Sequence, residues 1–202
     1  TEPREGKIYI TCDGIGRKEF TVRQLHTIVP KGGSADFDTF THEGNNLYTA
    51  ISDETKAGWK LTNGYIRKPK WVKPNAASKF PGLYGNVEQV GTLTSPEIES
   101  GCGTLTLEMT GKTLKKNIPN GIGVQVEIVQ NEKTVKSFNL SISQEDYAQA
   151  KPLERSQEVN VPGKFSVVIK NACPSGLVNT GHVGYTDEDV LITSVSWTGY
   201  TE

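Results

Sequence analysis

The chain has few cysteines and no long hydrophobic run, and both shortages narrow what it can be. Its three cysteines, Cys12, Cys102 and Cys173, lack the C-x-x-C spacing of structural zinc sites, so no metal site is expected on them. Their odd number leaves at least one thiol unpaired. We expect buried free thiols ahead of the alternative, a bridge between Cys102 and Cys173. No run of roughly 18 apolar residues occurs, so no membrane span is expected.

The chain also has almost no net charge, and the common catalytic sequence motifs are missing. The 22 Lys and Arg residues nearly balance the 23 Asp and Glu residues, so no overall field would draw the chain to nucleic acid. The histidines His26, His42 and His182 lack the H-E-x-x-H spacing, and neither a G-x-S-x-G elbow nor a complete phosphate-binding glycine loop occurs. We therefore expect no enzyme activity. A monomeric chain is a separate expectation.

Turn-forming residues, in contrast, are plentiful. With 21 Gly, 10 Pro and 35% hydrophobic residues, the composition favours short strands joined by many turns. The length suits one large β domain. The stretch P-K-G-G-S near Pro30 to Ser34 resembles a linker, so we divide the chain into an arm or added strands at residues 1–30 and a sandwich at residues 31–202.

Period-two alternation predicts two hairpins. Apolar residues alternate from Ile122 to Ile128 and from Phe138 to Ile142, and an odd loop over residues 131–133 pairs Val126 with Phe138 and Val124 with Leu140. A three-residue loop through residues 162–164 likewise sets Val161 opposite Phe165.

Further strands are expected nearby. In the last one Leu191, Thr193, Val195 and Trp197 share a face, and Trp197 caps the core. The other expected elements are strands at residues 7–11, 35–41, 59–65 and 103–109, and a helical turn within residues 144–151.

Several segments together resemble a known group of proteins. They read A-D-F-D-T-F from Ala35, A-G-W-K-L-T-N-G, G-T-L-T-S-P with G-C-G-T-L-T-L, V-Q-V-E-I-V-Q, E-V-N-V-P-G-K-F-S-V-V-I-K-N, and I-T-S-V-S-W ending at Trp197. The chain thus resembles the jelly-roll modules of secreted bacterial proteins, in the cleaved-adhesin-like and MAM-like (galactose-binding-like) group. The resemblance implies an all-β, two-sheet antiparallel β-sandwich (jelly roll) that is secreted or held at the cell envelope and has no catalysis of its own.

One segment mixes positive charge with aromatic rings. Its candidate ligand-binding residues are Arg67, Lys70, Trp71, Lys73 and Tyr84. Flat rings suit the apolar side of a sugar, and polar groups suit its hydroxyls. The alternative is a solvated surface loop in which Trp71 folds back on the sandwich, since prolines punctuate this stretch.

Acidic residues at both ends of the matched region suggest a metal site. Some jelly rolls of the resembling group bind structural calcium between early and late segments. Carboxylate oxygens of Asp36 and Asp38 could meet those of Asp187 and Asp189 as calcium ligands. The alternative is that all four are solvated turn residues.

These observations predict a non-catalytic extracellular binding module for a carbohydrate or a cell-surface protein. One alternative is a structural or interaction domain that docks a neighbouring domain or partner, which an exposed apolar edge would favour. Another is a secreted hydrolase of sugar or phosphodiester bonds, for which acid pairs such as Glu97 and Glu99 would have to flank a cleft.

Overall fold

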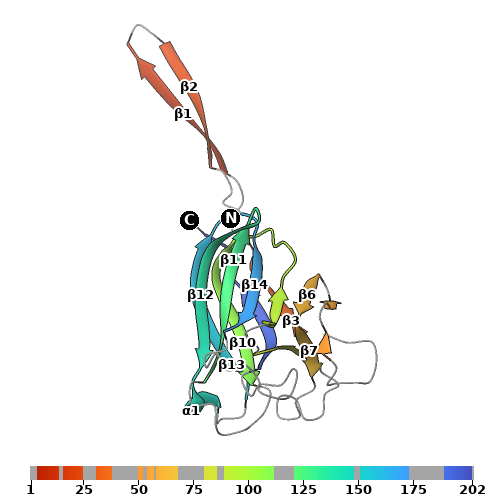
Figure 1. Cartoon of the computed structure of the whole chain (residues 1–202). Coiled ribbons are helices and arrows are strands. Elements are labelled where there is room, and N and C mark those ends of the chain that lie inside the picture. Colours follow the sequence, from red (N-terminus) through yellow and green to blue (C-terminus); the bar gives the residue numbers. More distant parts are fainter. Residues whose placement is uncertain are drawn as a thin grey trace.

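The computed structural model shows a two-sheet antiparallel β-sandwich and a separate N-terminal β-hairpin (Figure 1). The predicted all-β sandwich is therefore confirmed. The structure describes residues 4–13, 16–24, 31–37, 50–51, 54–56, 58–67, 80–85, 89–111, 121–147, 151–172 and 189–201. Within these residues, no helix is long and apolar enough to cross a membrane.

The first sheet has seven strands: six follow the order β13–β10–β15–β8–β7–β4, and the seventh, β3, pairs with β15. Strand β10 pairs with one side of β15, and both β8 and β3 pair with the other side. The strands are β3 (Gly33–Asp36), β4 (Ala50–Ile51), β7 (Gly64–Arg67), β8 (Phe80–Leu83), β10 (Cys102–Gly111), β13 (Leu153–Val161) and β15 (Val190–Trp197).

The second sheet has six strands in the order β12–β11–β14–β9–β6–β5. They are β5 (Glu54–Lys56), β6 (Trp59–Thr62), β9 (Thr92–Thr94), β11 (Ile122–Gln130), β12 (Lys133–Ile142) and β14 (Ser166–Asn171). A short helix, α1 (Gln144–Tyr147), follows β12 where the sequence predicts a helical turn. Every pairing in both sheets is antiparallel.

The core lies between the two sheets and follows the alternation of the sequence. On β10 the side chains of Leu105, Leu107 and Met109 are fully buried, whereas the residues between them are partly exposed. Val124 and Val126 of β11 contribute to the same apolar cluster from the other sheet. Burying each such side chain stabilises the fold by about 1.5 to 3 kcal/mol.

The predicted pairing of β11 with β12 is confirmed, but the predicted turn is wrong. Val126 lies opposite Phe138 and Val124 opposite Leu140. The turn has two residues, Asn131 and Glu132, with φ values of 48° and 63°, as in a type I′ turn. The register contains a bulge between Ile128 and Val129, where one residue of β12 has no partner. This extra residue shifts the strand pairing by one position, which is the shift that the predicted three-residue loop would have produced.

The hairpin predicted around Pro162 and Gly163 is wrong. Strand β13 belongs to the first sheet and pairs with β10, whereas β14 belongs to the second sheet and pairs with β11. The turn therefore crosses from one sheet to the other. Two strands that face one core from opposite sheets carry the same apolar alternation as two paired strands, so the sequence pattern could not separate these cases.

The single strand predicted over residues 59–65 is also divided between the sheets. Asn63, with a φ of 50°, separates β6 from β7, which lie in the second and first sheets respectively. The strand predicted at residues 35–41 is observed from Gly33 to Asp36, and residues 38–41 lie outside the described residues. The strand predicted at residues 103–109 is confirmed within β10.

The last strand contains a bulge that corrects its predicted faces. Met109 pairs with Ile192 and Glu108 with Ser194, which leaves Thr193 as an extra residue in β15. Ile192 and Val195 consequently face the core, while Leu191 joins a different buried cluster. The predicted capping by Trp197 is confirmed, because its indole packs against the core with its ring centroid 6.4 Å from that of Phe165.

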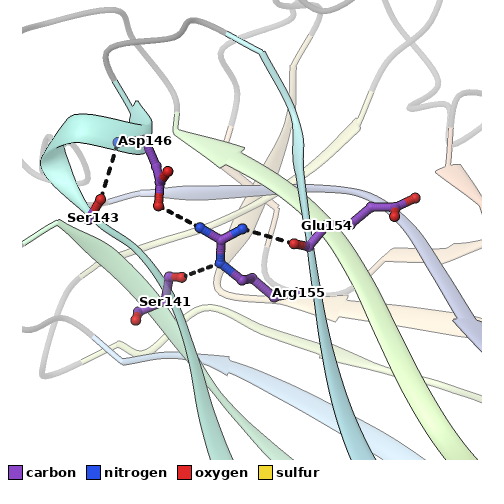
Figure 2. A network of polar contacts seen from close by, with 5 residues as sticks. All are labelled: Ser141, Ser143, Asp146, Glu154 and Arg155. Atoms are coloured by element: carbon purple, nitrogen blue, oxygen red, sulfur yellow. Dashed lines mark hydrogen bonds and ion pairs between the residues drawn. The ribbon is translucent and has the colours of Figure 1, made fainter.

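At one edge of the sandwich, Arg155 links the two sheets (Figure 2). From β13, Arg155 donates hydrogen bonds to the carbonyl oxygens of Ser141 on β12 and of Glu154, each at 2.9 Å. Its guanidinium also pairs with Asp146 of α1 at 2.6 Å. Lys136 of β12 reaches back to the carbonyls of residues 158 and 159 at 3.0 and 2.9 Å. Two cations thus tie together the edge strands of opposite sheets.

The N-terminal hairpin consists of β1 (Arg4–Cys12) and β2 (Gly16–Gln24), which contain the strand predicted at residues 7–11. Among the described strands, these two pair only with each other. In Figure 1 the hairpin extends away from the sandwich. The division of the chain at residue 30 stays a prediction.

Candidate functional site

The outer face of the seven-stranded sheet carries a transverse row of hydroxyl groups. The register sets Ser156 of β13 opposite Thr106 of β10, Thr106 opposite Ser196 of β15, and Ser196 opposite Ser34 of β3. Cross-strand partners share a face, and the neighbouring Leu105 and Leu107 point into the core, so this row points outward. It crosses four strands, a span of roughly 14 Å.

A second row, rich in carboxylates, runs parallel to the first. Glu154 lies opposite Glu108, Glu108 opposite Ser194, and Ser194 opposite Asp36. The two rows lie two residues apart along each strand, which is roughly 7 Å. Hydroxyls and carboxylates side by side can both accept hydrogen bonds, and the hydroxyls can also donate them.

The bulge in β15 helps to fix this second row. Thr193 is buried, and its hydroxyl oxygen lies 2.5 Å from Glu108 Oε2 and 3.0 Å from the Glu108 carbonyl oxygen. The bulge also turns Ser194 outward, next to Glu108. A hydroxyl donor held in the strand thereby restricts the orientation of the central carboxylate.

A third row on the same face is buried and ends at an aromatic ring, and we call it the aromatic row. Register pairs run from Thr110 to Leu191, from Leu191 to Gly82, and from Gly82 to Tyr65. Tyr65 and Leu191 form a small apolar cluster with Tyr84, and the two tyrosine ring centroids are 5.4 Å apart. Glycine is required in this row, because a Cβ at Gly82 would come within 2.5 Å of the Tyr65 ring.

The predicted ligand-binding segment begins and ends beside this aromatic row. Arg67 of β7 lies opposite Phe80 of β8, so residues 68–79 connect two paired strands. Lys70, Trp71 and Lys73 fall outside the described residues, as does the side chain of Arg67. Tyr84 is described and is only 6% exposed, so it packs against Tyr65 instead of presenting an open ring.

Two of the four predicted calcium ligands are described, and they are separated. Asp36 lies opposite Ser194, five residues along β15 from Asp189, a distance of roughly 15 Å. Asp189 is fully buried, and its Oδ1 accepts a hydrogen bond from the Gly85 backbone at 2.9 Å, where β8 meets the start of β15. Asp38 and Asp187 lie outside the described residues, so the calcium site stays a prediction.

The acid pair named for the hydrolase alternative, Glu97 and Glu99, lies on the surface of the described part of the chain. No group of three or more His, Cys, Asp or Glu side chains in it is placed to hold a metal ion. The Lys164 ammonium lies 3.3 Å from Glu97 and 2.8 Å from Glu99 on the surface. Hydrogen bonds to Glu99 and Glu97 raise the pKa of Lys164. The two carboxylates are thus charge-paired with the same ammonium group on an exposed surface.

Cys102 is a buried free thiol, as the sequence predicts. Its burial raises the pKa to about 11, and the positive charge of Lys136 opposes this shift. A thiol with so high a pKa is a poor nucleophile. Cys102 therefore acts as a small core residue. The Cys12 side chain and Cys173 lie outside what the structure describes.

The polar rows were not recognised from the sequence, although a signal is present. In T-L-E-M of β10, which begins at Thr106, and in S-V-S of β15, every second residue is polar and belongs to one of the two rows. The alternation predicts half-buried strands, but it does not say which strands are neighbours. Only the sheet order brings the hydroxyls of β13, β10, β15 and β3 into one line.

Comparison with known proteins gives similarity at the level of structure only. No family model and no curated protein sequence matches the chain. Three similar solved structures are the CBM35 from Cellvibrio japonicus Abf62, the K1 cleaved adhesin domain of Lys-gingipain from Porphyromonas gingivalis W83, and the C-terminal CBM6 of LamC from Zobellia galactanivorans.

The identities of these three structures to the chain are 16%, 12% and 13%, and the TM-scores are 0.48, 0.45 and 0.40. The matches cover 76%, 85% and 82% of this chain and 95%, 99% and 99% of the others. A cleaved adhesin domain is thus among the similar structures, as the sequence resemblance suggests. Each TM-score is below 0.5, so none of the three assigns a ligand to this chain.

Proposed function

We propose that the chain is a non-catalytic binding module that holds a carbohydrate against the outer face of its seven-stranded sheet. The observation that carries this proposal is the pair of parallel rows, one of hydroxyls and one mainly of carboxylates, on neighbouring strands. Sugar hydroxyls need partners that donate and accept hydrogen bonds at short, regular intervals, and these rows supply both. Binding outside the cell or at the envelope is part of the proposal.

The predicted segment between β7 and β8 belongs to the same proposal. Its ends lie at the aromatic row, next to the carboxylate row. We assign Trp71 the stacking contact with a sugar ring, and Arg67, Lys70 and Lys73 the hydrogen bonds to its substituents. Tyr84 is assigned the role of a buried support beneath this segment, because its ring packs against Tyr65.

The ligand class follows from the charge of the rows. The carboxylates of Glu154, Glu108 and Asp36 would repel a polymer with an acid on each sugar. A neutral polysaccharide meets no such penalty at the rows, and its hydroxyls can still accept hydrogen bonds from the cationic side chains of the segment, so we assign the module a neutral ligand.

The test is a screen of immobilised polysaccharides with the purified chain, run with calcium and with chelator. We expect binding to a neutral glycan that falls at least tenfold in Ser196→Lys, because the new side chain covers the hydroxyl row. Ser137→Lys, on an exposed position of the six-stranded sheet, is the matched control and should bind normally. Loss in Trp71→Ala would support the assigned stacking contact.

Two results would contradict the proposal. One is a blank across neutral glycans with folded protein. The other is equal binding by Ser196→Lys and the unsubstituted chain. Sensitivity to chelator would support the predicted calcium ligands Asp36, Asp38, Asp187 and Asp189, and identical binding in chelator would remove calcium from the proposal.

A second candidate function is docking to another protein surface. The exposed apolar face of the β1–β2 hairpin favours it, since such a face is otherwise costly to keep in water.

A further inference from the structure

The two faces of the β1–β2 hairpin differ in chemistry. Pairs of the register alternate between them, so Ile8, Ile10, Phe20 and Val22 share one face. These side chains are 52%, 55%, 51% and 49% exposed. Among the described residues outside the hairpin, the one other large hydrophobic side chain with comparable exposure is Val135. The apolar residues of the hairpin are therefore a contiguous patch.

The opposite face of the hairpin has its polar contacts within itself. The Lys7 ammonium lies 2.6 Å from a carboxylate oxygen of Glu19. The Arg17 guanidinium stacks 3.5 Å above the ring of Tyr9. Such a face is suited to water, whereas the apolar face is not. An isolated two-stranded hairpin is marginally stable, and packing of its apolar face against another layer would stabilise it.

We propose that the apolar face of the hairpin packs against the same face of a second copy of this chain. Two copies placed face to face form a small four-stranded, two-layer sandwich. A lipid surface is a poorer occupant, because hydrocarbon would take the open strand edges away from water, whereas a face-to-face dimer leaves their backbone groups hydrated. This proposal does not depend on carbohydrate binding, and it departs from the monomer expected from the sequence.

Charge selects the orientation of the two hairpins. Among the charged side chains that the structure describes, Lys18 is the one that lies on the apolar face, where it is opposite Ile10. In a parallel stack, the two Lys18 ammonium groups would lie at the same end and repel each other. In an antiparallel stack centred on the Ile8–Phe20 pair, they lie at opposite ends, separated by about four residues of strand, or roughly 13 Å.

The shape of the apolar face fits the antiparallel arrangement. Gly6 lies two residues before Ile8 on the apolar face, and a Cβ there would meet nothing within 4 Å. When Ile8 lies over Ile8 of the second copy, Gly6 lies over its Ile10. The space above glycine then accepts a β-branched side chain, which is the alternation of small and large residues that packed sheet faces need.

The area of the patch predicts weak association. Half-exposed side chains of this size offer about 100 Å² each, so each hairpin contributes about 400 Å² and the pair about 800 Å². Stable interfaces bury roughly 1,200 to 2,000 Å² in total, so we expect dimers at high micromolar to millimolar concentration.

The test is sedimentation equilibrium of the whole chain from low micromolar to millimolar concentration. The average mass should rise toward that of a dimer for the unsubstituted chain and stay monomeric for Phe20→Lys. Thr21→Lys adds the same charge to the other face of the same strand, so it is the matched control and should still dimerise. A second measurement, hydrogen exchange of residues 4–24, should show protection that increases with concentration.

Gly6→Trp distinguishes this packing from unspecific hydrophobic association, because it fills the space reserved for Ile10. We expect it to abolish the dimer. A stronger dimer in Gly6→Trp would overturn the antiparallel stack. A monomeric unsubstituted chain at millimolar concentration, or a dimer that persists in Phe20→Lys, would overturn the proposal itself.

Discussion

The hairpin and the sandwich have the same sequence alternation but opposite exposure. In β10 the apolar residues of the alternation are fully buried, and in β1 and β2 the equivalent residues remain about half exposed. Both segments form regular antiparallel strands. The difference shows that alternation is enough to specify a strand and its two faces, whereas burial depends on a second layer that only the sandwich supplies.

Phe165 and Phe20 offer the largest test of this difference. Phe165 is 1% exposed and packs against Trp197, so Phe165→Ala should lower the free energy of unfolding by about 3 to 5 kcal/mol. Phe20→Ala should change it by less than about 0.5 kcal/mol, because its ring touches water in a separate sheet. Urea denaturation followed by tryptophan fluorescence measures both. Equal losses would mean that the hairpin and the sandwich unfold as one unit.

The pKa of Cys102 reports how well the sandwich core excludes water. Its pKa is raised from 9.0 to about 11 in the folded chain, so the unfolded thiol releases its proton at lower pH than the folded one. This contribution to stability is present below pH 9 and is lost as pH rises to about 11, a loss of about 2 to 3 kcal/mol.

The measurement for Cys102 is the free energy of unfolding at pH 8 and pH 10.5 in the chain and in Cys102→Ala. The substitution lowers stability at both values, and it should remove this part of the alkaline loss. The same alkaline dependence in both proteins would show that Cys102 is not its source.

Arg155 and Lys7 each form an ion pair, at the sandwich edge and in the hairpin respectively. Arg155 also donates to two backbone carbonyls of neighbouring edge strands, and its side chain is 30% exposed. Arg155→Met should therefore cost about 1 to 2 kcal/mol, and the conservative Arg155→Lys should show a smaller loss because it keeps the charge. Thermal unfolding at moderate salt measures this. An unchanged melting temperature in Arg155→Met would mean that the hydrogen bonds and the ion pair of Arg155 do not stabilise this edge of the sandwich.

The smallest effect is expected at the Lys7–Glu19 pair. Both side chains are about half exposed, at 52% and 45%, so water and salt screen their attraction. Glu19→Gln should change the free energy of unfolding by less than about 0.5 kcal/mol. Circular dichroism of the whole chain during unfolding at low and high salt checks this. A loss comparable to that of Arg155→Met would contradict the contrast drawn between the two regions.

Much of the fold could be predicted because it depends on local periodicity. The register of β11 with β12 follows from keeping Val124 and Val126 on one face with Leu140 and Phe138. The turn was predicted wrongly, because a two-residue turn with a bulge and an odd loop without one give the same parity. The crossover after Val161 was missed for a related reason, since the alternation does not record which sheet a strand joins.

The candidate site was harder to predict because it depends on sheet order. The sequence directed attention to one segment, around Trp71, where unusual residues are contiguous. Ser34, Thr106, Ser156 and Ser196 are ordinary residues that are distant along the chain, and they acquire meaning only as neighbours across four strands. The bulge at Thr193, which moves Leu191 off the predicted core face, has no signature that distinguishes it from regular alternation.

The most direct test of the proposed function is to map the ligand on the labelled protein by nuclear magnetic resonance. A neutral oligosaccharide from the glycan screen is titrated while backbone amide shifts are followed. The proposal predicts that the largest shifts fall at Ser34, Thr106 and Ser196, on the outer face of the seven-stranded sheet. Shifts confined to the outer face of the six-stranded sheet, for example at Gln125 and Ser137, would contradict it.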